Sequence, residues 1–295
     1  MQTLLIAGLG DVARRAVPLL RGHWRLLALT HTADQRQSAR DLGIVPILAD
    51  LDDAASLARL AGLAQAVLYT APPPSSTTHD PRLLNLLSAL RKADSIPQRL
   101  VYISTSGVYG NRDGQWIDEC APCRPATARA RRRLAAERCL RRAAAWPMAV
   151  TILRAPGIYA GDRLPLARLH AGTPVAMAED DSYGNHIHAD DLARLCALAL
   201  RRRGGIRIYN ACDDEPIRFG DWFDLLAERF GLPRPPRLPL ATLQQSLTPV
   251  QASFLAESRP LDNRRLKREL GAALRYPSVR AFLADATLAL DGKIR

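Results

Sequence analysis

The stretch Thr3-Leu-Leu-Ile-Ala-Gly-Leu-Gly-Asp-Val-Ala13 determines how the rest of the chain is interpreted. Its apolar run Leu4–Ala7 predicts a buried parallel strand. The run breaks at two glycines and resumes as an expected helix from Asp11 to about Arg21, with Asp11 as a candidate N-cap. A strand, a tight turn and a helix are therefore expected to follow one another directly.

The glycine spacing in this turn indicates a dinucleotide site. Gly8 and Gly10 permit a tight turn and the approach of a pyrophosphate, and the small Ala13 lets helix and strand pack closely. A helix N-terminus favours an anion because its N–H groups lack partners and its dipole is positive there. Gly8, Gly10, Asp11, Val12 and Ala13 are accordingly predicted to bind the cofactor. The alternative is a tight turn with a purely structural role.

Strands and helices alternate through the first half of the chain. Further strands are expected at Trp24–Thr30, Ile44–Leu48, Gln65–Ala71, Arg99–Thr105 and Met148–Arg154. Helices are expected at Asp34–Leu42, Ala54–Leu60, Pro81–Ala93 and Thr127–Ala145. This order predicts an α/β fold, specifically a Rossmann doubly wound parallel sheet.

The regular alternation ends after Arg154, where a second region is expected. A helix, a strand that could rejoin the sheet and a further helical region are expected at Asp190–Arg203, at Ile206–Ala211 and from Glu215 onward. We therefore predict an NAD(P)-binding Rossmann domain over residues 1–155, rejoined by about 186–212. A small, mostly helical C-terminal substrate lobe is expected over residues 156–295, interleaved with the sheet.

The composition narrows the class of protein. The chain has 295 residues and a formal net charge of +12, carried almost entirely by arginine because there are only three lysines. The arginine runs are scattered over predicted helices with few aromatic residues among them, which favours solvated helix faces over a nucleic-acid surface. No apolar run approaches the ~18–20 residues that span a bilayer, and the early first strand leaves no room for a signal peptide. We expect a cytoplasmic protein with no nucleic-acid or membrane partner.

The cysteines do not indicate a disulfide framework or a metal site. Their number, five, is odd, and the chain is expected to be cytoplasmic. Cys120 and Cys123 have Cys-x-x-Cys spacing, but no second pair and no nearby histidine completes a zinc site. An ordinary loop is the simpler interpretation and a redox role is the alternative, so no metal is predicted.

The segment Val101-Tyr-Ile-Ser-Thr-Ser-Gly-Val-Tyr-Gly110 resembles the fifth-strand signature of the extended short-chain dehydrogenases/reductases, the NAD-dependent epimerase/dehydratase family. Four further stretches agree with this family in the same order: Leu153–Tyr159, His186–Leu192, Tyr209–Pro216 and Leu261–Gly271. The resemblance covers essentially the whole chain and is nearest to the atypical branch typified by the bacterial YeeZ proteins. It implies a Rossmann domain, a bound NAD(P) and a small substrate lobe.

The resemblance also implies a chemistry based on a Ser/Thr, a Tyr and a Lys. In the family the Tyr moves a proton while hydride passes to or from the nicotinamide, the Lys lowers the Tyr pKa and holds the ribose, and the hydroxyl bonds the reacting oxygen. Thr105 matches the hydroxyl position, and Ser104 beside it is an expected cofactor contact. No Tyr-x-x-x-Lys occurs anywhere in the chain, and Arg129 and Arg133 stand at the aligned positions.

Arginine cannot replace tyrosine as a proton shuttle because it stays protonated at any working pH. Arg133 is predicted to clamp ribose, phosphate or a substrate carboxylate, whereas a site role and a solvated helix face stay equally open for Arg129. The proton shuttle is then sought elsewhere. Tyr109 follows the strand end, where the loop could direct it toward a substrate, and His186 carries an imidazole that titrates near neutrality. Thr105, Tyr109 and His186 are the predicted catalytic residues, with packing as the alternative for Tyr109.

The expected end of the second strand favours NADP over NAD. An NAD site usually places an acidic residue there, and this chain has none at that position. His31 and Arg36 are close enough to meet a 2′-phosphate, and Thr30 or Thr32 could hydrogen-bond it.

The family resemblance implies further cofactor contacts at the C-terminal ends of later strands. They are Asp50 and Leu51 near adenine, Thr70, Ala71 and Pro72 on the ribose and nicotinamide side, and Pro156, Gly157 and Ile158 near the carboxamide.

Two functions stay open. One is an NADP-linked oxidoreductase or epimerase/dehydratase-like enzyme with an unusual proton shuttle, acting on a small polar or anionic substrate. The other is a non-catalytic NADP(H)-binding redox sensor or scaffold, which the missing Tyr and Lys favour; a nucleic-acid binder is the weakest alternative. Family members often dimerise through the helices that flank the fifth strand, so a homodimer stays open, although the arginines of Arg131–Arg142 make that packing harder to assume.

Overall fold

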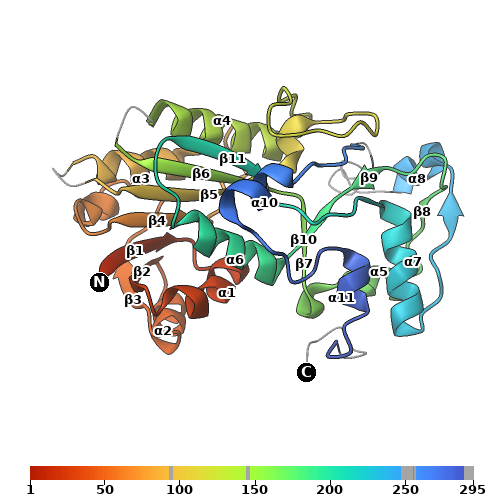
Figure 1. Cartoon of the computed structure of the whole chain (residues 1–295), viewed down its shortest axis with the longest axis horizontal. Coiled ribbons are helices and arrows are strands. Elements are labelled where there is room, and N and C mark those ends of the chain that lie inside the picture. Colours follow the sequence, from red (N-terminus) through yellow and green to blue (C-terminus); the bar gives the residue numbers. More distant parts are fainter. Residues whose placement is uncertain (93–95, 144–146, 247–254, 256, 289–295) are drawn as a thin grey trace.

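A computed structural model of the chain describes residues 1–92, 96–143, 147–246, 255 and 257–288 (Figure 1). Its central sheet has the strand order β11-β6-β5-β4-β1-β2-β3, and every neighbouring pair is parallel. The strands are β1 (Gln2–Ala7), β2 (Trp24–Thr30), β3 (Val45–Leu48), β4 (Ala66–Tyr69), β5 (Arg99–Thr105), β6 (Ala149–Ala155) and β11 (Ile206–Asn210). The predicted Rossmann doubly wound parallel sheet is confirmed.

Helices cover both faces of this sheet (Figure 1). One face carries α1 (Asp11–Leu20), α2 (Ala33–Asp41) and α6 (Ala189–Ala199), and the other carries the 3₁₀ helix η1 (Ser56–Leu60), α3 (Pro81–Leu90) and α4 (Ala128–Ala143). Leu4 and Ile6 of β1 belong to the core under α1 and α6, whereas Leu5 and Ala7 belong to the core under α3 and α4. Because successive side chains of a strand point to opposite faces, a strand covered on both faces is apolar throughout.

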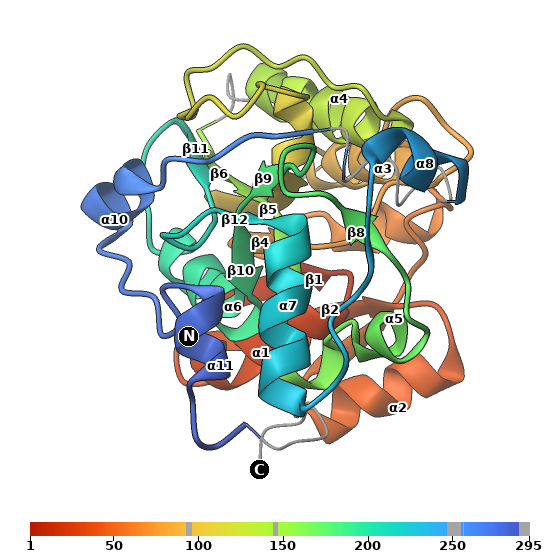
Figure 2. The ribbon, with the colours of Figure 1, turned by 90° about the vertical axis from the view of Figure 1, so that its right-hand side faces the viewer.

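A smaller region follows the carboxyl ends of the strands (Figures 1 and 2). It contains three short strand pairs: β7 (Gly157–Tyr159) with β10 (His186–His188), β9 (Tyr183–Gly184) with β12 (Ile217–Arg218), and β8 (Val175–Ala176) with β13 (Arg237–Leu238). Its helices are the 3₁₀ helix η3 (Gly161–Arg163), α5 (Leu166–His170), α7 (Phe219–Phe230), α8 (Leu240–Ser246) and α11 (Val279–Leu283). Figure 2 shows α7 at the centre with α5 and α11 on either side, and α10 (Arg264–Leu270) farther out. An aromatic core holds the region together, with Tyr159, Trp222, Phe223, Tyr276 and Phe282 buried in one cluster.

The expected elements are present with shifted ends, and one differs in type. The segment expected as a helix over Ala54–Leu60 forms the shorter 3₁₀ helix η1. The expected strand Ile206–Ala211 is β11, which pairs with β6 at the edge of the sheet. Ala93 and residues 144–145, the ends of two expected helices, lie outside the described residues. Within the part of the chain that the structure describes, no helix is long and apolar enough to cross a membrane.

Candidate cofactor and substrate site

The turn after β1 is fixed by the close approach of Gly8 to the end of β4. Gly8 has a φ of +101°, and a Cβ there would lie 2.6 Å from the backbone nitrogen of Ala71. Neither this conformation nor this spacing admits a side chain. The Thr70 hydroxyl donates a hydrogen bond to the Gly8 carbonyl, and the Ala71 nitrogen donates to the Ala7 carbonyl at 3.0 Å. The glycine turn and the predicted contacts at the end of β4 therefore form one unit.

Gly10 lacks a side chain for a different reason. Its backbone is extended, with φ −83° and ψ −171°. Apart from its two chain neighbours, no described residue has an atom within 4 Å of a Cβ built there. The protein's own packing thus leaves open space beside Gly10. A ligand that must approach the backbone closely requires such space.

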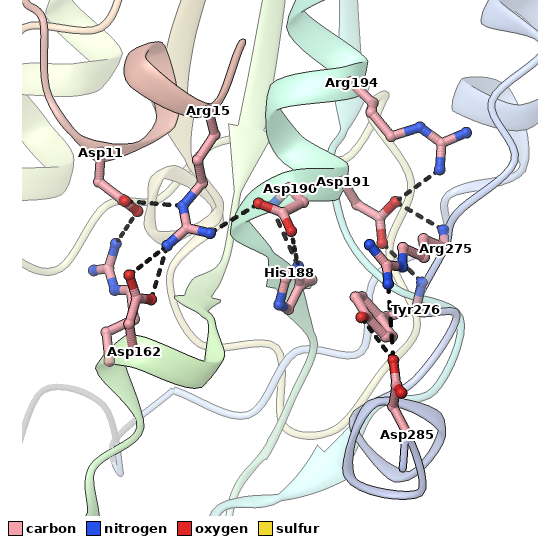
Figure 3. Close-up of polar contacts among 11 residues, drawn as sticks. Asp11, Arg15, Asp162, His188, Asp190, Asp191, Arg194, Arg275, Tyr276 and Asp285 are labelled. Atoms are coloured by element: carbon pink, nitrogen blue, oxygen red, sulfur yellow. Dashed lines mark hydrogen bonds and ion pairs between the residues drawn. The ribbon is translucent and has the colours of Figure 1, made fainter. Parts of the chain in front are cut away.

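The N-terminus of α1 has no side-chain cap, which corrects the expectation for Asp11. Gly10 is the N-cap residue, and Asp11 is the first residue of the helix. The Asp11 carboxylate instead accepts a hydrogen bond from Arg15 at 2.8 Å (Figure 3). It also accepts one from Arg163 at 3.0 Å. The N–H groups of this first turn have no side-chain acceptor among the described residues, so the turn fits the diphosphate of a dinucleotide.

The four residues expected near a 2′-phosphate differ in their exposure and in their hydrogen bonds. Thr30 is buried and its hydroxyl donates to the Ile47 carbonyl at 3.4 Å, which corrects the expectation that this hydroxyl meets the cofactor. The Thr32 hydroxyl caps α2 by accepting from Gln35 N at 3.2 Å. His31 is exposed and Arg36 half-buried, so these two side chains keep their predicted role.

Asp50 and Leu51 shape the loop at the end of β3. Asp50 Oδ1 accepts a hydrogen bond from Asp52 N at 2.9 Å, and the Leu51 carbonyl accepts from Asn85 Nδ2 at 3.0 Å. Both residues are half-buried at this strand end. Their contact with adenine stays a prediction.

Arg133 reaches from α4 to the end of β4. Its Nη1 donates to the Tyr102 hydroxyl at 3.0 Å and to the Ala71 carbonyl at 3.3 Å, and its guanidinium carbon lies 5.4 Å from the centroid of the Tyr102 ring. Burial raises the pKa of Tyr102 to about 12, against the lowering effect of Arg133, so Tyr102 stays a neutral phenol. Arg133 thereby places a guanidinium beside the loop that contacts Gly8.

A cavity of about 620 Å³ lies between the carboxyl ends of β5 and β6 and the smaller region. The sheet contributes Thr105 and the predicted carboxamide contacts Pro156, Gly157 and Ile158 to its lining. Its charged lining residues are Arg129, Arg133, Arg163, Arg168, Arg259 and Glu257. The cavity is thus strongly cationic.

Thr105 and Ser104 are neighbours with different environments. Thr105 Oγ1 accepts a hydrogen bond from Gly107 N at 3.2 Å, which leaves its O–H directed to no acceptor among the described residues. Ser104 is buried, and its hydroxyl donates to Glu137 Oε1 at 2.6 Å. Of the two hydroxyls, only that of Thr105 is left to donate to a ligand. Ser104 also lines the cavity, and its contact with the cofactor stays a prediction.

The expectation that Tyr109 faces a substrate is wrong. Tyr109 ends the 3₁₀ helix η2 (Ser106–Tyr109), is fully buried and does not line the cavity. Its hydroxyl donates to Asn210 Oδ1 at 2.7 Å, and Arg154 lies 4.7 Å from its ring centroid. Burial raises the pKa of Tyr109 well above its usual value. The structure gives this tyrosine a packing role.

His186 lines the cavity, as predicted for a residue that meets a substrate. Its ring centroid lies 5.3 Å from that of Trp222 and 6.1 Å from that of Tyr159. Nδ1 is buried and has no hydrogen-bond partner among the described residues. Burial lowers the pKa of His186 to about 4, so the imidazole is neutral near pH 7.

Several lining residues were not predicted from the sequence. Arg168, Glu257 and Arg259 come from a short helix and a loop whose positions depend on tertiary packing, and no local pattern singles them out. The one usable signal was the helical spacing of Phe219 and Trp222, which both line the cavity from α7.

Comparisons with known proteins agree with this architecture. The model of the family described as "NAD dependent epimerase/dehydratase family" matches residues 5–212. A structure described as a functionally unknown conserved protein from Silicibacter pomeroyi is 31% identical, with a TM-score of 0.79 over 96% of this chain and 97% of that one. A search of curated proteins gives no significant match.

Two structures with bound ligands are similar in fold. A UDP-glucose 4-epimerase from Thermotoga maritima with UDP-glucose is 16% identical, with a TM-score of 0.76 over 95% of this chain and 97% of the other. MoeE5 in complex with UDP-glucose and NAD is 21% identical, with a TM-score of 0.75 over 98% of each chain.

Proposed function

Because the chain belongs to the NAD dependent epimerase/dehydratase family, we propose that it is an NADP-linked oxidoreductase or epimerase-like enzyme that acts on a small polar or anionic substrate. One observation carries the proposal: Arg133 lines the cavity that holds Thr105 and also bonds Ala71, the residue against which Gly8 packs. The glycine turn and the cavity are thereby parts of one crevice. When bound, the nicotinamide cofactor supplies hydride transfer.

The glycine turn and the first turn of α1 hold the diphosphate. Within the described part of the chain, no side chain accepts from the N–H groups of Asp11, Val12 and Ala13, and no residue fills the space beside Gly10. His31 and Arg36, after β2, bind the 2′-phosphate that distinguishes NADP from NAD. A complex with NAD is known for MoeE5, so both nucleotides belong in the test.

Arg133 has the ribose-binding role of the lysine that this chain lacks. Its permanent charge lies beside the Ala71 carbonyl, where it holds the ribose. A guanidinium does not release a proton, so Arg133 orients the bound nucleotide and adds positive potential without taking part in proton transfer.

Thr105 and His186 act on the substrate. The Thr105 O–H, which has no acceptor among the described residues, donates a hydrogen bond to the reacting oxygen. His186, neutral near pH 7, exchanges a proton with the substrate through its imidazole. Glu257, the one carboxylate among the described lining residues, is paired with Arg259.

Steady-state turnover tests this proposal. The protein is assayed for NADPH oxidation and NADP⁺ reduction with a panel of carbonyl compounds, sugar acids and nucleotide sugars. We expect turnover with at least one compound, lowered at least about 100-fold in kcat by Thr105→Val. Turnover that Thr105→Val leaves unchanged would assign the chemistry to other groups, and silence across the panel would contradict enzymatic function.

A non-catalytic NADP(H)-binding sensor is the second candidate, and one observation favours it. Arg129 and Arg133 stand at the positions aligned with the family's Tyr and Lys, and Tyr109 is turned into the core. This function requires nucleotide binding without turnover and a partner whose binding depends on the redox state of the nucleotide. Recovery of identical partners in the presence of NADP⁺ and NADPH would remove its basis.

A further inference from the structure

We propose that Arg168 binds an anionic group, a carboxylate or a phosphate, of the molecule that occupies the cavity. This inference rests on the proposed function in one respect, since it takes the cavity to be the substrate site. It adds the chemical class of the group recognised and the residue that recognises it.

Arg168 projects from α5 onto two aromatic rings of α7. Its guanidinium carbon lies 4.8 Å from the ring centroid of Phe223 and 5.3 Å from that of Phe219. Nε is buried and has no hydrogen-bond partner among the described residues. Burial lowers the pKa of Arg168, which shows that its surroundings disfavour the charge. A guanidinium held in this way gains stability from an anion that enters the cavity.

The other cavity arginines with described contacts are already occupied. Arg259 pairs with Glu257, Arg163 lies 3.0 Å from Asp11, and Arg133 bonds Tyr102 and Ala71. For Arg168, by contrast, no carboxylate of a described residue lies within 4.0 Å, and no described residue accepts a hydrogen bond from its side chain.

The smaller region also contains carboxylates, and these pair with a different arginine. Arg237 of β13 alone contacts three of them: Asp224 at 2.5 Å, Asp221 at 3.4 Å and Asp181 at 3.6 Å. Acidic residues are therefore available in this part of the fold, yet the described ones leave Arg168 without a partner. The charge of Arg168 is therefore available to an anionic ligand.

The geometry of the group determines which anions suit it. A guanidinium presents a planar set of donors that matches the two oxygens of a carboxylate or a phosphate. The rings of Phe219 and Phe223 lie against the Arg168 guanidinium, and Arg168 is one of the residues that line the cavity. An anionic group bound there anchors a substrate whose reacting carbon lies beside Thr105, in the same cavity.

Arginine-selective NMR on the full chain tests the proposal without cofactor or substrate. The Nε–Hε signal of Arg168 is assigned by its loss in Arg168→Lys, and inorganic phosphate and acetate are titrated separately in a buffer free of other multivalent anions. We expect a saturable shift of this signal with at least one anion, and the anion that saturates first identifies phosphate or carboxylate as the preferred group. Arg234, an exposed arginine of the same region that does not line the cavity, is the internal control. A shift no larger than that of Arg234 with both anions would overturn the proposal.

Paired variants separate this proposal from the proposed function. Arg168→Met is expected to weaken the binding of the preferred anion by at least about tenfold, and Arg234→Met to leave it unchanged. NADP⁺ affinity, measured by calorimetry on the same samples, is expected to be unaltered in both variants. If Arg234→Met also lost anion binding, the loss would follow from the lower net charge of the protein. That result would contradict a specific role for Arg168. Absent NADP⁺ binding in the wild type would contradict the proposed function alone.

Discussion

Arg15 Nη1 lies 2.8 Å from Asp190 Oδ1, a contact that joins α1 to the start of α6 (Figure 3). The same guanidinium contacts Asp11 at 2.8 Å and Asp162 at 2.7 Å. One side chain thus connects the dinucleotide turn, the 3₁₀ helix η3 and α6. The Arg15 and Asp190 side chains are only 20% and 31% exposed, so solvent screens the pair less than it screens a surface ion pair.

Arg15→Met is therefore expected to lower the free energy of unfolding by about 2 kcal/mol, because carboxylates from three elements lose their shared partner. Urea denaturation measures the loss. Arg194→Met is the control on α6, since Arg194 is 44% exposed and lies 3.6 Å from Asp191. A loss no greater than that of the control would show that the Arg15 contacts contribute little to stability.

Gly8→Ala is expected to destabilise the fold by at least about 2 kcal/mol. The new Cβ would lie 2.6 Å from the Ala71 nitrogen at a φ of +101°, and a backbone atom cannot move aside as a flexible side chain can. Thermal unfolding of the nucleotide-free protein checks this. A melting temperature equal to that of the wild type would contradict the close contact between the turn and β4.

His186 predicts a specific dependence of stability on pH. Its folded pKa is about 4, whereas the ordinary value is 6.5, so the unfolded chain binds this proton more tightly. The contribution of His186 to stability is complete at pH values above the pKa of the unfolded state. It is lost as the pH falls toward the pKa of the folded state. Between about pH 7 and about pH 5 the loss is about 2 kcal/mol. Urea unfolding at both pH values should show a pH dependence that is smaller by this amount in His186→Gln.

His170→Gln serves as the control for this measurement, because His170 is an exposed histidine of the same region. It should leave the pH dependence of stability as in the wild type. If His186→Gln does the same, the imidazole is not held in its neutral form by burial.

Glu137 and Arg154 form a buried pair, and Glu137 accepts a hydrogen bond from Ser104, a residue that lines the cavity. Glu137 Oε2 lies 2.6 Å from Arg154 Nη2, and both side chains are almost fully shielded from solvent. Glu137→Leu is expected to cost about 3–5 kcal/mol because it leaves a buried guanidinium without its anion. The double variant Glu137→Leu/Arg154→Met should lose less stability than the single variant, as chemical denaturation can show. A larger loss in the double variant would mean that Arg154 stabilises the fold even without its anion, which contradicts the reason given for the loss in Glu137→Leu.

The first half of the chain was predictable from sequence because its signals are local. The apolar run of β1, the glycine turn and the start of α1 are contiguous, and each parallel strand that is covered on both faces is apolar throughout. Thr105 was predictable for the same reason. It is the last residue of a parallel strand that is covered on both faces, and it lines the cavity.

The substrate side was not predictable in this way. Tyr109 is turned inward by Asn210, a residue of β11 about a hundred positions later, and no local pattern reports such a contact. Arg168 meets Phe219 and Phe223 only because α5 and α7 pack together. Thr30 was misjudged in the same direction as Tyr109. Its position after the glycines suggested a cofactor contact, but its side chain is buried and its hydroxyl bonds the Ile47 carbonyl of the neighbouring strand.

Calorimetric titration of NADP⁺ and NAD⁺ into the wild type and Gly10→Ala tests the central claim most directly. Apart from the chain neighbours of Gly10, no residue that the structure describes approaches a Cβ at this position within 4 Å, so Gly10→Ala should alter the free energy of unfolding by less than about 1 kcal/mol. The same methyl group would stand where the diphosphate approaches, and affinity should fall at least about tenfold. We expect a saturable binding heat with the wild type and a higher affinity for NADP⁺ than for NAD⁺. In Gly10→Ala we expect a stably folded protein whose affinity for both nucleotides is markedly lower. No heat with either nucleotide, or equal affinity in Gly10→Ala, would contradict a dinucleotide site at this turn.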